Sequence, residues 1–269
     1  MPLKLEGHRA KKRFGQNFLS DPHWIGRIIE SIDPKPGEAL IEIGPGQAAL
    51  TKEIIAKSGH ETAVEIDRDL AAWLRTIFAP EELSLIEADA LSLDWSTVLP
   101  GRRLRIFGNL PYNISSPILF ALLKAADRVE DQHFMLQREV IDRMVCPPGS
   151  RTYGRLSAML QRHYRMQKLF DVPPGAFRPA PKVVSSVVRM TPIPASEKGE
   201  ADDELYAQVV AAAFSMRRKT LRNALGKLLE APEIEAAGIS PTARAETLGV
   251  AEFEALARAL EAKRKAAAF

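Results

Sequence analysis

A glycine-rich turn follows an apolar run near the start of the chain. Residues 42–49 read Glu-Ile-Gly-Pro-Gly-Gln-Ala-Ala, the G-x-G-x-x-A form of a turn between a strand and a helix. Gly44 and Gly46 let the backbone come close to a ligand, and the first turn of the following helix offers unpaired N–H groups. Such turns are frequent by chance, so a nucleotide site needs a second signal.

Acidic residues at the ends of the next two apolar runs supply that signal. Glu65 closes the second run about 20 residues after the turn, where this kind of site places a carboxylate that accepts hydrogen bonds from ribose hydroxyls. Asp67 is interpreted as a helix cap. Asp89 follows the third run and could accept a hydrogen bond from an adenine amino group. These residues indicate a nucleoside-bearing cofactor, which could be a nicotinamide dinucleotide or S-adenosylmethionine.

The fourth apolar run ends in the most specific feature of the sequence. Asn109-Leu110-Pro111-Tyr112 resembles the (N/D)-P-P-Y signature of amino-group methyltransferases, in the N-L-P-Y form typical of ribosomal RNA adenine dimethyltransferases. An adenine amine is a poor nucleophile because its lone pair is delocalised into the ring. The Asn109 side-chain oxygen and the carbonyl of Leu110 or Pro111 could accept both amine protons and favour a pyramidal nitrogen. Tyr112 could stack on the extruded base.

Longer stretches carry the same resemblance. KKRFGQNFL, IEIGPGQAALT, FGNLPYNISSPI and FRPAPKVVSSVV are similar to the bacterial small-subunit (16S) ribosomal RNA adenine N6,N6-dimethyltransferases, the kasugamycin-sensitivity enzymes, and the similarity extends from about Lys11 to residues 217–225. The resemblance implies cofactor contacts from Asn17, Leu19, Gly44, Glu65, Asp89 and Asn109. It also implies that Phe177 helps to sandwich the target adenine against Tyr112.

A reaction and a substrate follow from this resemblance. It implies an S-adenosylmethionine-dependent enzyme that dimethylates N6 of two adjacent adenosines in the 3′-terminal loop of 16S rRNA, on an immature 30S subunit during its maturation. It also suggests a monomer. The related 23S rRNA dimethyltransferases and DNA adenine methyltransferases are alternatives, as is a non-enzymatic assembly or transcription factor descended from a methyltransferase.

A parallel sheet is needed to bring these residues together. Residues 39 to about 138 alternate short apolar runs with amphipathic ones, the pattern of strand–helix units in a doubly wound sheet. Polar residues at the carboxyl ends of such strands share one edge of the sheet. Ser20-Asp21-Pro22 predicts the start of an amphipathic helix that runs to Ile32, and Gly59 is the expected C-cap of the helix after the glycine turn.

The second half of the chain predicts the end of this sheet and a separate helical part. Strand-like runs at 165–172 and 182–190 flank a proline-rich loop and are expected to extend the sheet. Residues 191–204 resemble a linker, and only helical periodicity follows. We therefore predict an α/β fold: a Rossmann-like class I methyltransferase domain over 1–195, with a basic arm at 1–20, and a small all-helical RNA-binding domain over 202–269.

Basic residues form three clusters although the formal net charge is only +3. One cluster begins the fourth strand at Arg102, Arg103 and Arg105. Clusters of this kind can neutralise phosphates, although each could also be a solvated surface. The residues predicted to contact RNA are Lys11, Lys12, Arg13, Arg217, Arg218, Lys219 and Arg222.

The composition limits the remaining possibilities. With 46% hydrophobic and 26% charged residues, the chain is typical of a globular protein. Cys146 is the only cysteine and the five histidines lie far apart, so we expect no intramolecular disulfide and no metal site. No apolar run approaches bilayer length and no secretory signal is recognisable, which favours a cytoplasmic protein.

Overall fold

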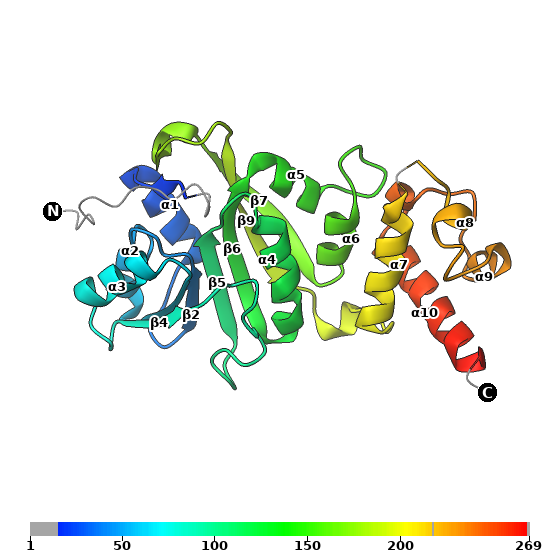
Figure 1. Ribbon diagram of the computed structural model, residues 1–269, viewed down its shortest axis with the longest axis horizontal. Coiled ribbons are helices and arrows are strands. Elements are labelled where there is room, and N and C mark those ends of the chain that lie inside the picture. The colour runs from blue at the N-terminus through cyan, green and yellow to red at the C-terminus, as the bar shows by residue number, and fades with distance from the viewer. Residues whose placement is uncertain (1–15, 217, 268–269) are drawn as a thin grey trace. The chain divides into compact units, whose positions relative to one another are not determined.

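The computed structural model of the protein describes residues 16–216 and 218–267 (Figure 1). Lys11, Lys12, Arg13 and Arg217 lie outside the described residues. Contacts divide the chain into two compact units. The first comprises the described residues up to Ile141 together with Met166–Pro192, and the second comprises Asp142–Arg165 together with the described residues from Ile193 onward. Residues 142–165 thus group with the C-terminal helices, whereas the sequence analysis assigned them to the first domain.

A seven-stranded sheet forms the centre of the first unit, with strand order β4-β3-β2-β5-β6-β9-β7. The strands are β2 (Ala39–Ile43), β3 (Glu61–Glu65), β4 (Leu83–Glu87), β5 (Leu104–Asn109), β6 (Val129–Gln137), β7 (Tyr164–Val172) and β9 (Ser185–Pro192). Strands β2 to β6 pair in parallel, and β9 pairs antiparallel with β6. The ends of β2 to β6, which we call the carboxyl edge, therefore lie beside the start of β9. The predicted α/β fold is confirmed.

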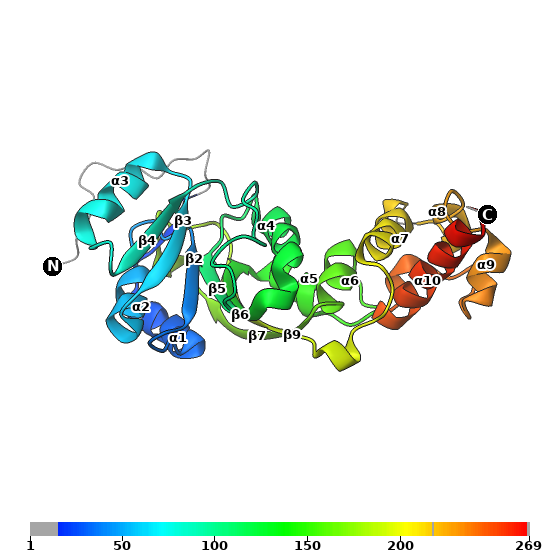
Figure 2. The same ribbon diagram turned by 90° about the horizontal axis from the view of Figure 1, so that it is seen from below.

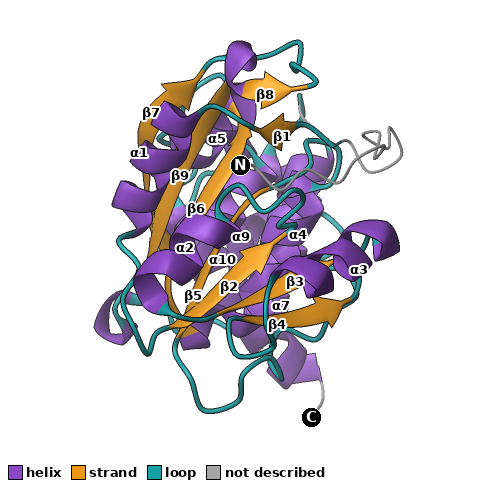
Figure 3. Cartoon of the chain, turned by 90° about the vertical axis from the view of Figure 1, so that its left-hand side faces the viewer, coloured by secondary structure: helices purple, strands orange, loops and turns teal. Residues whose placement is uncertain are grey.

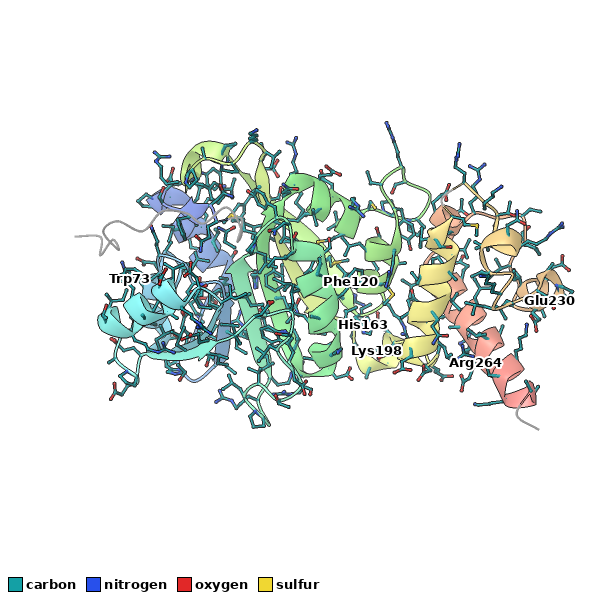
Figure 4. All side chains as sticks on the ribbon, in the orientation of Figure 1. Trp73, Phe120, His163, Lys198, Glu230 and Arg264 are labelled. Atoms are coloured by element: carbon teal, nitrogen blue, oxygen red, sulfur yellow. The ribbon has the colours of Figure 1, made fainter. Side chains whose placement is uncertain are left out.

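Helices cover both faces of this sheet. They are α1 (Pro22–Ile32), α2 (Thr51–Ser58), α3 (Arg68–Ile77) and α4 (Ser115–Leu122). Helix α5 (Arg138–Val145) follows β6, and the division between the two units falls within it. Ile29 of α1 and Ile54 of α2 share a buried cluster with Leu40 and Phe107 of the sheet. Trp73 of α3, labelled in Figure 4, packs in a second cluster that includes residues of α2 and β3. Figure 3 shows α4 on the opposite side of the strands from α1.

The first helix begins and ends where the sequence predicts. The Asp21 carboxylate accepts a hydrogen bond from the His23 N–H at 2.9 Å, and Pro22 occupies the first helical position, where a missing N–H costs nothing. Ile28, Ile29 and Ile32 form its buried face. This spacing of apolar residues directs α1 onto the sheet.

The helix after the glycine turn begins later than predicted. The G-x-G-x-x-A form predicts a helix directly after the glycines, but residues 47–50 form a turn in which Ala48 has a φ of 59°, and α2 begins at Thr51. The extra turn lies at the carboxyl edge of the sheet. Gly59 ends α2 in the left-handed conformation, with a φ of 80°, so the predicted C-cap is confirmed.

A small second sheet connects distant parts of the first unit. Strand β1 (Phe18–Leu19) pairs antiparallel with β8 (Phe177–Arg178), and Leu19 lies opposite Phe177. The Ser20 N–H also donates to the Ala176 carbonyl at 2.8 Å. This pairing holds the described start of the chain against the proline-rich loop.

Arginines at the start of β5 belong to the structural framework of the first unit. Arg105 is 8% exposed, and its guanidinium contacts Glu38 at 2.5 Å and Asp131 at 2.8 Å. Arg102 and Arg103 donate to the backbone carbonyls of Gly37 and Val129. The prediction that this cluster could neutralise phosphates is wrong for Arg105, because its charge is buried and already paired. The cluster lies at the strand starts, which we call the amino edge.

The second unit is helical. Its helices are α6 (Arg155–Gln161), α7 (Asp203–Ser215), α8 (Leu221–Ala224), α9 (Ala231–Ala236) and α10 (Val250–Ala267). Helix α7 lies beside α10 (Figure 2), where Tyr206 and Phe253 meet with ring centroids 6.3 Å apart. A buried ion pair joins Arg162 to Glu254 at 2.5 Å. None of the helices in the described part of the chain is long and apolar enough to cross a membrane.

Candidate functional site

A cavity of about 270 Å³ opens at the carboxyl edge of the sheet. The six residues that the resemblance implied as cofactor contacts all line it: Asn17, Leu19, Gly44, Glu65, Asp89 and Asn109. Leu110, Pro111 and Tyr112 line it as well. The sheet topology therefore brings the glycine turn, the strand-end carboxylates and the tetrapeptide to a single cavity.

The glycine turn forms the floor of this cavity. Gly44 and Gly46 have φ values of 71° and 55°, in the left-handed region that favours glycine. The Gly44 N–H donates to the Val64 carbonyl at 2.9 Å, which fixes the turn to β3. A side chain at Gly46 would place its Cβ 3.1 Å from the Phe18 ring. The described N-terminal segment thus packs directly on the turn.

Glu65 is held by backbone N–H groups at the end of β3. Its Oε1 accepts from the Asp67 N–H at 2.8 Å, and its Oε2 accepts from the Gly46 N–H at 3.3 Å. The residue is 4% exposed, and this burial raises the pKa of its carboxyl despite the two hydrogen bonds. Each carboxylate oxygen keeps a lone pair for a ligand hydroxyl. Asp67 caps α3 by accepting from the Asp69 N–H, as predicted.

Asp89 lines the cavity beside apolar residues that follow the strand ends. Its Oδ1 accepts from the Leu91 N–H at 2.9 Å, which orients the carboxylate. Ile66 and Leu91 also line the cavity, although they are 43% and 37% exposed. Exposed apolar side chains beside two carboxylates suit a flat, partly polar ring such as a nucleobase. Ile66 and Leu91 were not predicted, although each lies within two residues of a predicted carboxylate.

Asn109 is fixed at the end of β5, next to the glycine turn. Its Nδ2 donates to the Asn17 carbonyl at 2.9 Å, so its Oδ1 is the atom that remains to accept a donor. The preceding residue must be glycine, because a Cβ at Gly108 would lie 2.4 Å from the Ile43 carbonyl oxygen. This close approach brings Asn109 beside the end of β2.

The rest of the tetrapeptide is anchored at both ends. Leu110 is 1% exposed, and its N–H donates to the Met135 carbonyl at 3.2 Å. The half-buried Tyr112 ring places its hydroxyl 2.6 Å from the Ser185 Oγ. Burial raises the pKa of Tyr112, so its hydroxyl stays neutral at physiological pH. The loop therefore presents an amide oxygen, backbone carbonyls and an uncharged aromatic ring.

Phe177 does not lie where the resemblance suggested. It is 0% exposed and packs in the core with Leu19, Ile28 and Val172, and it is absent from the described residues that line the cavity. Its pairing with Leu19 in the small sheet explains this burial. In this conformation the Phe177 ring is covered, and its stacking on a base stays a prediction.

Two buried glutamates, one of which lines the cavity, were also missed. Glu42 lines the cavity, is 2% exposed, and accepts a hydrogen bond from the Thr51 Oγ1 at 2.6 Å. Burial raises its pKa to about 7. Glu61 is fully buried, and neither of its side-chain oxygens has a hydrogen-bond partner among the described residues. Its pKa is raised well above the usual value, first by burial and then by the Glu42 charge. Glu42 lies within the otherwise apolar strand β2, which was the signal for it, whereas Glu61 begins β3 and had no such signal.

Comparisons with known proteins agree with this geometry. The family described as ribosomal RNA adenine dimethylase matches residues 7–262. The chain is 55% identical over 256 residues to the ribosomal RNA small subunit methyltransferase A of Aromatoleum aromaticum, covering 95% of this chain and 96% of the relative. It is 53% identical to the protein of the same name from Xanthomonas campestris pv. campestris, covering 92% and 95%.

Solved structures share the fold at lower identity. A dimethyladenosine transferase from Plasmodium falciparum is similar with a TM-score of 0.76 and 23% identity, covering 93% of this chain and 98% of that one. The 23S rRNA methyltransferase ErmE is similar with a TM-score of 0.68 and 24% identity, covering 91% and 100%. Because the match to this family extends over most of the chain, the chain belongs to the ribosomal RNA adenine dimethylases.

Proposed function

We propose that the protein transfers methyl groups from S-adenosylmethionine to N6 of two adjacent adenosines in the 3′-terminal loop of 16S rRNA. We further propose that its substrate is an immature 30S subunit, and that it acts as a monomer without a metal ion. The observation that carries the proposal is the position of Asn109, whose amide nitrogen is occupied by the Asn17 carbonyl while its oxygen is left for a donor. An adenine amine has two protons to donate.

Residues of the cavity suit the cofactor. Glu65, held by two backbone N–H groups, can accept hydrogen bonds from ribose hydroxyls. Asp89 can accept one from the adenine amino group, and Ile66 and Leu91 offer apolar contacts to the ring. When bound, S-adenosylmethionine supplies a methyl group made electrophilic by a positively charged sulfur. The negative carboxylates around the cavity also favour a cofactor with net positive charge.

The tetrapeptide activates the acceptor through hydrogen bonding alone. The Asn109 Oδ1 and the carbonyl of Leu110 or Pro111 accept the amine protons, which draws the nitrogen lone pair out of conjugation with the ring. Tyr112 stacks on the extruded base and restricts its orientation. A proton leaves the nitrogen once its new bond has formed, when the nitrogen is strongly acidic. The chain therefore needs no strong general base, and positioning accounts for the rate.

Basic residues of the second unit are suited to hold the RNA. Arg218, Lys219 and Arg222 are exposed, and the Leu221 N–H donates to the Ala243 carbonyl at 2.8 Å, which anchors this segment to its own unit. Exposed cations on a fixed segment can contact phosphates without reading sequence, as recognition of a folded RNA requires. Replacing all three by glutamine should raise KM for the RNA and reduce the salt dependence of binding, with kcat little changed.

Methyl transfer to purified substrates tests the proposal. The protein would be incubated with labelled cofactor and one of three acceptors: 30S subunits from cells lacking the modification, a naked 23S rRNA fragment, or a DNA duplex. We expect transfer to the 30S subunits, with N6,N6-dimethyladenosine as the final product nucleoside. Efficient transfer only to the 23S fragment or to DNA would contradict the proposed substrate. Failure to bind S-adenosylmethionine in calorimetry would contradict the proposed chemistry.

A further inference from the structure

We infer that Ser185 is a positioning residue that sets the orientation of the Tyr112 ring for the target base. This inference rests on the proposed function of Tyr112 as the stacking platform. Its starting observation is the 2.6 Å distance between the Tyr112 hydroxyl and the Ser185 Oγ, which joins the tetrapeptide loop to a strand 73 residues further along the chain.

The antiparallel direction of β9 brings Ser185 to the site. Ser185 is the first residue of β9 and pairs with Gln137, the last residue of β6. An antiparallel strand reaches the carboxyl edge with its start, whereas the parallel strands reach it with their ends. Ser185 can therefore meet Tyr112 from the side of the sheet opposite the glycine turn, beyond β6.

The Ser185 hydroxyl is a rigid anchor. Ser185 is 0% exposed, so its side chain has little freedom to change rotamer. The Val184 carbonyl accepts from the Arg138 N–H at 3.0 Å, and Ser185 itself pairs with Gln137 of β6. The backbone at Ser185 is thus held to other elements.

Hydrogen bonds within the Tyr112 loop fix its backbone and not its ring. The Ser115 Oγ donates to the Tyr112 carbonyl at 3.1 Å, and the Ile114 N–H donates to the Pro111 carbonyl at 3.2 Å. Neither bond restrains rotation about the Tyr112 side-chain torsions. Stacking on a base needs one ring plane, so a bond at the far end of the ring is the efficient way to select that rotamer.

A double-mutant cycle tests the inference. Ser185→Ala and Tyr112→Phe remove the same hydrogen bond from its two ends, and Tyr112→Phe keeps the aromatic ring. We expect each to lower kcat on 30S subunits on the order of 10-fold, as for a net hydrogen bond of about 1.4 kcal/mol. The double variant should be no slower than either single variant, because both changes break one contact.

Ser186→Ala is the matched control. It removes a buried serine hydroxyl from the adjacent position of the same strand, whose partner is Asp171 instead of Tyr112. We expect it to lower the unfolding midpoint about as much as Ser185→Ala while leaving kcat within about 2-fold of wild type, as for a substitution outside the site. The readouts are kcat and KM at saturating cofactor, the ratio of monomethyl to dimethyl product, and the unfolding midpoint.

Two results would overturn the inference. One is a Ser185→Ala variant whose kcat matches that of Ser186→Ala, and the other is a double variant whose losses multiply. If Ser185→Ala does not fold, Tyr112→Phe alone decides, since a wild-type kcat for that variant also rejects the inference. Tyr112→Ala separates rejection of the inference from failure of the proposed function. If Tyr112→Ala loses methyl transfer while Ser185→Ala does not, Tyr112 keeps its stacking role and Ser185 has no positioning role.

Discussion

Charged and polar residues gather at both edges of the central sheet, but the two groups differ in how many of their hydrogen bonds are made within the protein. At the amino edge, the Arg105 guanidinium contacts Glu38, Asp131 and the Ile32 carbonyl, all within 2.8 Å. At the carboxyl edge, Glu65 and Asn109 each use part of their hydrogen-bonding capacity on backbone groups and direct the rest into a cavity. The number of charges therefore does not distinguish a structural cluster from a ligand-binding site. The difference lies in how much hydrogen-bonding capacity remains for a ligand.

The largest effect is expected at the amino edge. Arg105→Met should lower the free energy of unfolding by about 3–5 kcal/mol, because it leaves Glu38 and Asp131 partly buried without their cation. Urea unfolding measures the loss, and kcat per folded molecule should be unchanged. Arg102→Met is the control, since its guanidinium is exposed and donates to the Gly37 carbonyl; its effect should stay within about 0.5 kcal/mol. Equal losses from both variants would remove the contrast between a buried and a surface arginine.

Asn109→Ala should lower kcat and leave stability almost unchanged, the opposite of Arg105→Met. We expect kcat to fall by about 10²–10³-fold, as when one donor or acceptor is removed from a reacting centre, while the unfolding midpoint changes little. Asn109→Asp keeps an acceptor oxygen but turns a second oxygen toward the Asn17 carbonyl, so it should rescue kcat only in part. Single-turnover methyl transfer makes the measurement. Wild-type kcat in Asn109→Ala would exclude Asn109 from the reaction.

Glu65 and Glu87 provide a matched pair at neighbouring strand ends. They lie opposite each other in the register of β3 and β4, but Glu65 lines the cavity whereas Glu87 pairs with Arg75 at 3.0 Å. Glu65→Ala should weaken S-adenosylmethionine binding by about 10–100-fold, the usual contribution of hydrogen bonds to a charged group. Glu87→Ala should leave affinity unchanged. Calorimetry measures both, and similar affinities for the two variants would refute the ribose role of Glu65.

The smallest effect concerns the two buried glutamates, Glu42 and Glu61. Their raised pKa values mean that the folded protein retains protons that the unfolded chain releases above about pH 4.5. Stability should therefore fall as pH rises from about 5 through 7, the pKa of Glu42. Glu61→Gln removes one of these groups, so it should be more stable than wild type by about 1–2 kcal/mol at pH 8, with a smaller difference at pH 5.

Urea unfolding at both pH values tests this prediction. Glu53→Gln on the exposed face of α2 is the control and should show no such dependence on pH. An advantage of Glu61→Gln that is larger at pH 5 than at pH 8 would contradict the assigned direction of the pKa shift.

Local patterns predicted much of this molecule. The cap at Asp21, the glycine turn, and the strands that end at Glu65 and Asn109 depend on residues close together in sequence, and all were found. Because parallel strands share an edge, the same patterns also predicted that Glu65, Asp89 and Asn109 would line one site.

Features that the sequence did not predict depend on pairing between distant segments. Phe177 was expected beside the base, but its strand pairs with Leu19 and places its ring in the core. Arg105 was assigned to a basic cluster, but its partners Glu38 and Asp131 come from other parts of the sequence. Ser185 had no signal of its own, because its role depends on the direction in which β9 enters the sheet.

The pairing of β1 with β8 also has a consequence for the order in which the chain folds. Ser20 and Ala176, which meet beside this small sheet, are 156 residues apart in sequence, so the pairing closes a very long loop for few hydrogen bonds. During synthesis, the glycine turn and its neighbouring strands can assemble well before residue 176 leaves the ribosome. Leu19 cannot pair with Phe177 until that part of the chain has emerged. Because few hydrogen bonds hold this segment in the folded protein, the backbone amides of residues 16–20 should exchange with solvent before those of the strands that line the same cavity.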